Sequence, residues 1–67
     1  MNPIIKDWLR DLYDAAIEDA ESSIGNERGW GNGADDDETI DMHNDNAELN
    51  EEYIDVLKAL KAEVDSL

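Results

Sequence analysis

Residues that disfavour helix are confined to two places, which leaves most of the chain free to be helical. The only proline is Pro3, and all four glycines fall between positions 25 and 33. Glycine weakens a helix interior and proline interrupts one. Residues 34–67 contain neither residue type. The sequence therefore predicts two helical segments separated by a glycine-rich loop at residues 25–34.

Apolar residues in the first segment recur at intervals of three and four, as they do on one face of a helix. Asn2 is a suitable N-cap, and Pro3 fits the first helical position, where no amide hydrogen is required. Gly25 is a typical C-terminal stop. These signals predict a helix over residues 3–24, with Trp8 and Tyr13 in the core. The apolar stripe comprises Ile5, Trp8, Leu9, Leu12, Ala16, Ala20 and Ile24.

The last segment carries a second apolar stripe with the spacing of a helix-bundle seam. Tyr53, Leu57, Leu60, Val64 and Leu67 are separated by four, three, four and three residues. Such spacing places the side chains on one face, where a second helix can pack against them. The segment therefore predicts a helix that ends near residue 66, with Tyr53 on its seam.

Two capping boxes leave the start of this helix open. Asp35 with Glu38 is one candidate, and Asp45 with Glu48 is the other. A start near Asp35 gives a long helix over about 36–66 and places acidic residues at the positive end of the helix dipole. A start at Asp45 gives a helix about as long as the first. We predict the longer of these two helices.

Two helices joined by a short loop form an antiparallel hairpin, so the fold class predicted is all-α, with a single domain over residues 1–67. A domain this small buries only about 60% of its surface. A lone hairpin also leaves part of both apolar stripes uncovered. We therefore expect the hairpin to associate with itself, as a homodimer or larger oligomer that forms a four-helix bundle.

The charge of the chain limits the partners it can bind. Nineteen acidic residues oppose five basic ones, for a formal net charge of −14. This excess disfavours nucleic acids and anionic membranes, which are bound through Lys and Arg. Residues 35–52, the acidic segment, hold nine acids and no Lys or Arg. An antiparallel hairpin would place this segment at the loop end and gather the following basic residues at the other end: Lys6, Arg10, Lys58 and Lys61.

The sequence offers little for catalysis or for a cofactor. It has no cysteine and one histidine, His43. With Asp41 as position one, a calcium loop would have Asp45 at position five and Glu52 at position twelve, but position six is Asn46 where such loops need glycine. We therefore predict no catalytic residue, no metal site and no cofactor.

Two sets of residues are candidates for binding. A tryptophan flanked by glycines, Trp30, either folds back to cap the end of the bundle, as is commoner for a lone loop aromatic, or serves as an exposed anchor, since Trp and Arg are enriched in interface hot spots. The set predicted to contact a partner protein is Arg28, Trp30, Asp35, Asp36, Asp37, Glu38, Asp41, His43 and Asp45. The set predicted to line a polar ligand pocket is Arg28, Trp30, His43, Asn46 and Asn50.

In size, charge and hairpin pattern the chain resembles small acidic helical proteins of bacteriophages. The resemblance covers the whole chain but includes no specific motif. It implies a cytoplasmic, non-enzymatic inhibitor that binds a basic surface of a host protein, through mimicry of nucleic acid or in counter-defence. One alternative is an oligomeric sponge that sequesters a signalling nucleotide or other small molecule between subunits. Another is a structural oligomerisation module.

Overall fold

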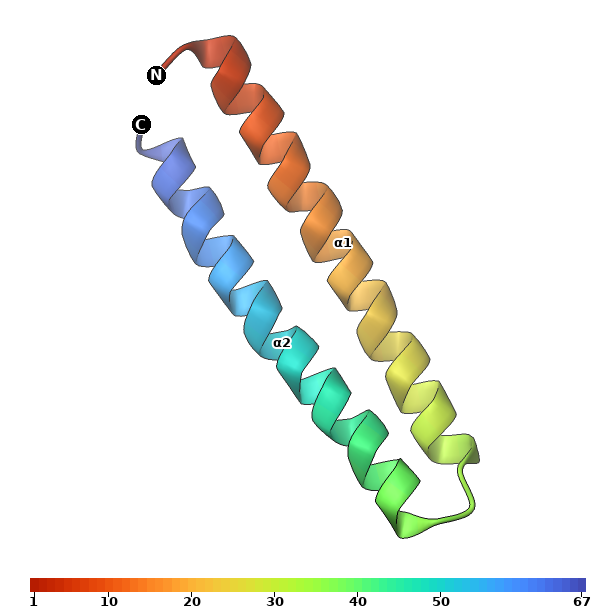
Figure 1. Ribbon diagram of the computed structural model, residues 1–67. Coiled ribbons are helices and arrows are strands. Elements are labelled where there is room, and N and C mark those ends of the chain that lie inside the picture. The colour runs from red at the N-terminus through yellow and green to blue at the C-terminus, as the bar shows by residue number, and fades with distance from the viewer.

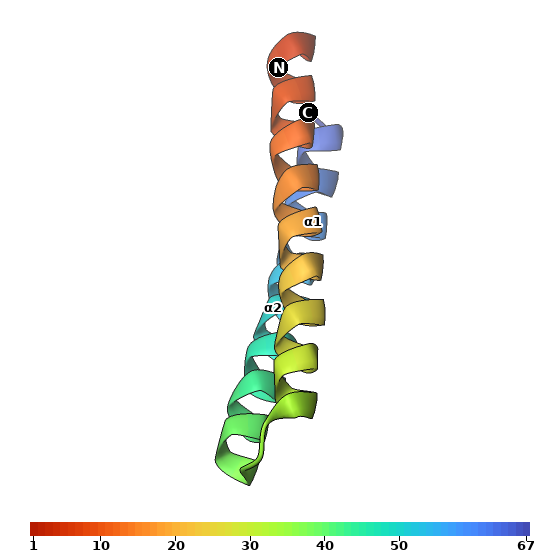
Figure 2. The same cartoon turned by 90° about the vertical axis from the view of Figure 1, so that its right-hand side faces the viewer.

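The computed structural model describes all residues from 1 to 67 and contains two helices and no strand. Helix α1 spans Pro3–Gly33, and helix α2 spans Asp37–Asp65. The helices lie antiparallel, with both termini at one end and the turn at the other (Figure 1). A view from the side shows a single thin layer (Figure 2), with Cα extents of 52 × 14 × 9 Å. The expected all-α hairpin is confirmed, and its assembly into a larger bundle stays a prediction.

Helix α1 begins as its sequence predicts. The side-chain oxygen of Asn2 accepts a hydrogen bond from the backbone N–H of Ile4 at 2.8 Å. This bond satisfies one of the amides that have no partner within the first turn. Pro3 follows as the first helical residue, where its fixed φ suits the helix and its missing N–H removes no hydrogen bond.

Helix α1 does not stop at Gly25 but continues to Gly33, so the predicted helix end and the predicted loop at 25–34 are wrong. No glycine has a positive φ, so none uses the conformation that other residues avoid. Helix α2 gives this stretch a packing partner, and tertiary packing overrides the weak helix propensity of glycine. Gly31 is buried at this contact, where an added Cβ would lie 3.4 Å from the Cβ of His43.

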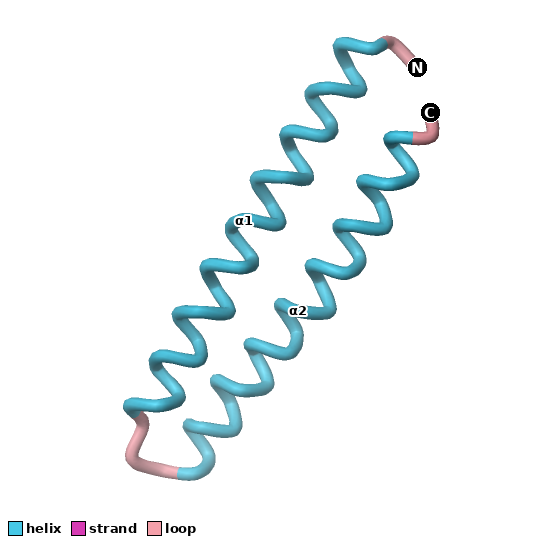
Figure 3. The backbone as a smooth tube through the Cα atoms, turned by 180° about the vertical axis from the view of Figure 1, so that it is seen from behind, coloured by secondary structure: helices cyan, strands magenta, loops and turns pink.

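The turn between the helices is only three residues long, at residues 34–36 (Figure 3). Asp36 is the N-cap of α2, and its carboxylate accepts a hydrogen bond from the backbone N–H of Thr39 at 2.7 Å. The long helix predicted over about 36–66 is thus confirmed to within one residue at each end. Neither Asp35 nor Asp45, the two predicted caps, is the cap residue.

The two helices meet along a seam with alternating spacings of three and four residues, as in a coiled coil. On α2 the half-buried or buried seam residues are Ile40, His43, Ala47, Asn50, Ile54, Leu57, Lys61 and Val64. On α1 they are Leu9, Tyr13, Ala16, Ala20, Ser23, Glu27 and Gly31. The seam is therefore apolar toward the termini and polar toward the turn.

This seam differs from the one predicted on α2. Tyr53 and Leu60 are 51% and 38% exposed, whereas Ile54 and Lys61 face α1 instead. Helix α2 has two overlapping apolar stripes that share Leu57 and Val64, which are both buried, and one neighbouring helix covers only one of the stripes. The prediction that Tyr53 lies on the buried seam is therefore wrong for the hairpin.

On α1, too, the observed seam differs from the predicted apolar stripe. Trp8, predicted to be in the core, is 66% exposed, because Leu9 and Tyr13 are the residues that turn toward α2. Tyr13 is half-buried. The exposed Trp8 and Leu12 lie beside the seam rather than in it.

The core of the hairpin is small. Only five apolar residues are buried, and twelve large apolar residues are exposed. The buried five are Ala20, Ala47, Ile54, Leu57 and Val64. Neither helix has a stretch long and apolar enough to cross a membrane.

Candidate interaction surfaces

Charge is divided unequally between the two ends of the rod. The turn half, residues 18–52, holds thirteen of the nineteen acidic residues and one of the five basic ones, for a net charge of −12. The terminal half, residues 1–17 and 53–67, holds six acidic and four basic residues, for a net charge of −2. The predicted division into a mixed-charge end and a strongly negative end thus follows from the antiparallel arrangement of the helices.

All nine carboxylates of the acidic segment are exposed. Glu51 is the only one of the nine in an ion pair, which it forms with Arg28 of α1. Asp36 is engaged in capping α2. The other seven carboxylates have no side-chain partner in the structure, so the field of the acidic segment is not neutralised locally: Asp35, Asp37, Glu38, Asp41, Asp45, Glu48 and Glu52.

The pKa of the Asp36 carboxyl is lowered by its role as the N-cap of α2. Hydrogen bonds from the side chain and then the backbone N–H of Thr39 hold the pKa of the Asp36 carboxyl below its usual 3.8. The cause is that these donors favour the charged form of the carboxyl group. The capping carboxylate therefore stays ionised at the positive end of the helix dipole.

A half-buried polar cluster joins the helices near the turn. The Nδ1 atom of His43 lies 2.5 Å from Oε2 of Glu27, and both side chains are less than one-fifth exposed. The ring of Trp30 lies against His43, with centroids 5.8 Å apart and the planes tilted by 56°. Trp30 itself is 57% exposed on helix α1. It is thus neither folded over the end of the bundle nor carried by a flexible loop.

The five residues of the predicted ligand pocket do not surround one cavity. Trp30 and His43 are in contact, but Arg28 is engaged by Glu51. The Asn50 amide donates to the Asn46 carbonyl oxygen one turn earlier, at 3.0 Å. The nearest hollow, of about 330 Å³, includes only Arg28 from the predicted set; it is lined by Arg28, Asn32, Asn44, Ala47 and Glu48.

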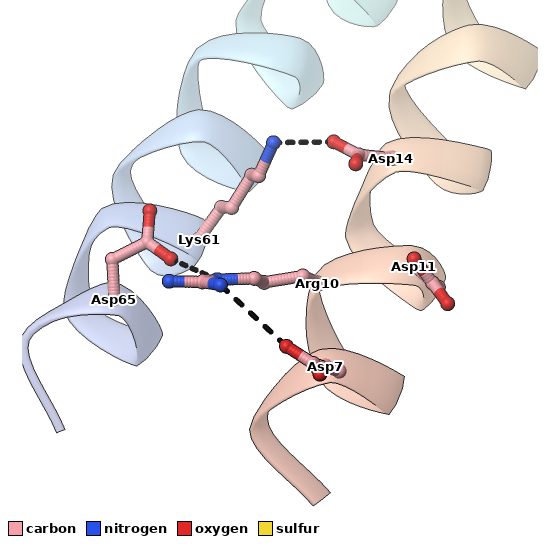
Figure 4. A pocket seen from close by; sticks show the side chains of 6 residues that line it. All are labelled: Asp7, Arg10, Asp11, Asp14, Lys61 and Asp65. Carbon is pink, nitrogen blue, oxygen red and sulfur yellow. Dashed lines mark hydrogen bonds and ion pairs between the residues drawn. The ribbon is translucent and has the colours of Figure 1, made fainter. Parts of the chain in front are cut away.

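A larger open groove lies along the terminal half, between α1 and α2 (Figure 4). It measures about 570 Å³ and is lined by Asp7, Arg10, Asp11, Asp14, Lys61 and Asp65. Arg10 of α1 pairs with Asp65 of α2, and Nζ of Lys61 lies 2.5 Å from Oδ1 of Asp14. The two basic side chains of the groove therefore link the two helices. Lys6 adds a third link, because its ammonium donates to the backbone oxygen of Asp65 at 2.7 Å. We call this side of the terminal half the charged flank.

The opposite side of the terminal half is apolar. On α1, Ile5, Trp8 and Leu12 are separated by three and four residues. They therefore share one face of the helix, which lies beside the seam and away from Asp7 and Asp14. On α2, Tyr53, Val56 and Leu60 form the apolar stripe next to the seam. They lie on the same side of the hairpin as the apolar face of α1. We call this surface the apolar flank, and it comprises Ile5, Trp8, Leu12, Tyr53, Val56 and Leu60, which are between 38% and 66% exposed.

The sequence interpretation missed Glu27 and Glu51, which hold His43 and Arg28 across the seam. Glu27 lies three residues after Ile24 and seven after Ala20, so it continues the apolar stripe of α1. The prediction that the helix ends at Gly25 places Glu27 in a loop and so excludes it from that stripe.

No group of three or more His, Asp and Glu side chains is arranged to hold a metal ion. Comparison of the chain with protein-family models, with curated proteins and with solved structures gives no match. The fold and the net charge define the protein as a small acidic helical hairpin.

Proposed function

We propose that the protein is a small acidic binding protein whose turn half docks on a basic surface of another protein, as a phage-type inhibitor would on a host target. The observation that carries this proposal is the row of exposed carboxylates without side-chain partners in the acidic segment. An unneutralised field of this kind steers a basic partner and aligns it before contact.

The density of charge favours a partner that normally binds nucleic acid. In α1 the turn half spans residues 18–33, a length of about 24 Å at about 1.5 Å per helical residue. Its net charge of −12 therefore amounts to about one charge per 2 Å, close to the roughly one charge per 1.7 Å along duplex DNA. A groove that accommodates a nucleic-acid backbone would accept a narrow rod of similar charge.

The test is capture of basic proteins from a cell lysate by two variants with matched changes. Asp41→Asn, Asp45→Asn and Glu48→Gln neutralise three exposed, unpaired carboxylates of the turn half. Asp11→Asn, Asp55→Asn and Glu63→Gln neutralise three exposed carboxylates of the terminal half. We expect the first variant to lose the partner and the second to retain it. We also expect duplex DNA and high salt to release the partner from the unmodified protein.

The readout is the amount of a partner recovered in stoichiometric yield, followed by a binding isotherm with the purified partner. Equal loss of binding in both variants would show that overall charge, rather than the turn half, determines recognition. Binding that survives excess duplex DNA would rule out competition for a nucleic-acid groove.

A further inference from the structure

The apolar flank is the largest feature of the molecule that the proposed function does not use. Trp8 and Leu12 of α1 are 66% and 63% exposed, and Tyr53 and Val56 of α2 are each 51% exposed. Exposed apolar surface of this extent on a small protein marks an interaction site. The question is which occupant it fits.

The size of the flank matches that of a protein interface. An aromatic side chain buries about 150–250 Å². At about 200 Å² for each of the six residues, of which only Trp8 and Tyr53 are aromatic, the exposed fractions amount to at most roughly 650 Å² in each copy. This value approaches the about 800 Å² per partner of a standard stable interface.

The hairpin also lacks the core that a folded domain of this size needs. Only five apolar residues are buried, and two of them are alanines. Domains below about 70–80 residues rarely obtain enough stability from one core without disulfides, a metal or association. The chain has no cysteine and no cluster suited to a metal, which leaves association as the remaining device.

The division of charge decides how two copies can meet. Placed side by side in parallel, two hairpins would bring their turn halves together, each with a net charge of −12. Overlapped at their terminal halves about a two-fold axis perpendicular to the rods, they join halves of net charge −2 and point the turn halves in opposite directions. Both arrangements can bury the apolar flank, but only the second also separates the strongly charged ends.

We propose that the apolar flank is the interface of a two-fold symmetric homodimer, in which the terminal halves overlap as a four-helix bundle and the two acidic turn halves project from its ends. The charged flank stays outside, where Arg10 and Lys61 pair with acids of their own chain. This inference does not rest on the proposed function, because the dimer leaves both turn halves free whatever they bind.

The unmodified protein provides the first measurement, by sedimentation equilibrium and small-angle scattering. We expect a dimer whose largest dimension is about 80 Å, since one rod of 52 Å is extended by half its length. A monomer at all concentrations would overturn the proposal. A dimer no longer than one rod would also overturn it, because the two hairpins would then overlap along their whole length and not at their terminal halves alone.

Two variants that each remove one exposed apolar side chain provide the second measurement. Trp8→Ser changes the apolar flank, and Met42→Ser changes an apolar residue of the turn half that is also exposed, at 51%. We expect Trp8→Ser to weaken dimerisation by about thirtyfold or more, as for a hot-spot tryptophan, and Met42→Ser to leave it unchanged. Equal weakening by both variants would overturn the proposal.

The salt dependence of dimerisation is measured on the unmodified protein, so this test does not require any variant to fold. Because the overlapping halves are nearly neutral, we expect the dimer dissociation constant of the unmodified protein to change by less than about threefold between 50 mM and 500 mM NaCl. A dimer that forms only at high salt would indicate turn halves held side by side and would overturn the proposed geometry.

Discussion

Single residues at the turn end decide where α2 begins and how the two helices are held in register. Asp36 caps α2 through its bond to Thr39. Glu27 and His43 link the two helices across the polar part of the seam at 2.5 Å. A half-buried pair of this kind adds little net stability but penalises any shift that separates its partners. The polar side chains therefore fix the register where the apolar seam is weakest.

The stability of the hairpin should depend on the ionisation of Asp36. Its folded pKa lies below the ordinary value of 3.8, so the stability it contributes is complete above the unfolded pKa and is lost as the pH falls through the lower, folded pKa. Asp36→Asn preserves a good cap without the charge, and Asp36→Ala removes the cap. We expect the alanine variant to be the less stable of the two at pH 7.

Helicity measured by circular dichroism during thermal unfolding at pH 7 and pH 3 tests this expectation. Between those pH values the asparagine variant should lose less stability than the unmodified protein, because it lacks the titrating group. An equal loss in both proteins would assign the acid sensitivity to other carboxylates.

At the scale of the elements, α1 combines a strong first half with a last third rich in glycine. The four glycines lie in its final nine residues, and only Gly31 is at the contact with α2. A side chain added at Gly25 or Gly29 would meet nothing within 4 Å. Glycine at those two positions therefore weakens the helix with no packing advantage in the hairpin.

Gly25→Ala should stabilise the protein by about 0.5–1 kcal/mol, because alanine loses less backbone entropy in a helix. Gly31→Leu should have the opposite effect, since its side chain would press against His43 and separate the helices. Urea unfolding followed by circular dichroism measures both. If residues 25–33 were a loop, as the glycines alone suggest, Gly25→Ala would have almost no effect and Gly31→Leu would be tolerated.

At the scale of the whole molecule, one thin layer of two helices carries a net charge of −14. The exposed ion pairs of the charged flank stabilise such a fold only weakly. Repulsion among the thirteen acids of the turn half opposes it, and this repulsion is screened by salt. The balance of these two effects determines how the protein responds to ionic strength.

We expect the melting temperature at a fixed protein concentration to rise as NaCl increases from about 10 mM to about 500 mM, since repulsion outweighs the weak surface ion pairs. The variant with Asp41, Asp45 and Glu48 neutralised should show a smaller rise. A melting temperature that falls with salt would mean that the ion pairs between α1 and α2 dominate instead.

The sequence by itself determined the two helices, the capping of α1 by Asn2 and the separation of charge between the ends. Each of these depends on local periodicity, a local cap or the order of residues along an antiparallel hairpin. It did not determine that Gly25 lies inside a helix, because the residues that continue α1 beyond Gly25, such as Glu27 and Gly31, are held by contacts with α2.

Tertiary structure also decided which apolar stripe became the seam. Helix α2 carries two stripes that share Leu57 and Val64, and periodicity treats Tyr53 and Ile54 as equal candidates. The choice depends on how both helices fit together and on which ion pairs close across them, such as Lys61 with Asp14. Because that fit involves residues far apart in sequence, only the folded hairpin shows that Ile54 is covered and Tyr53 is left exposed.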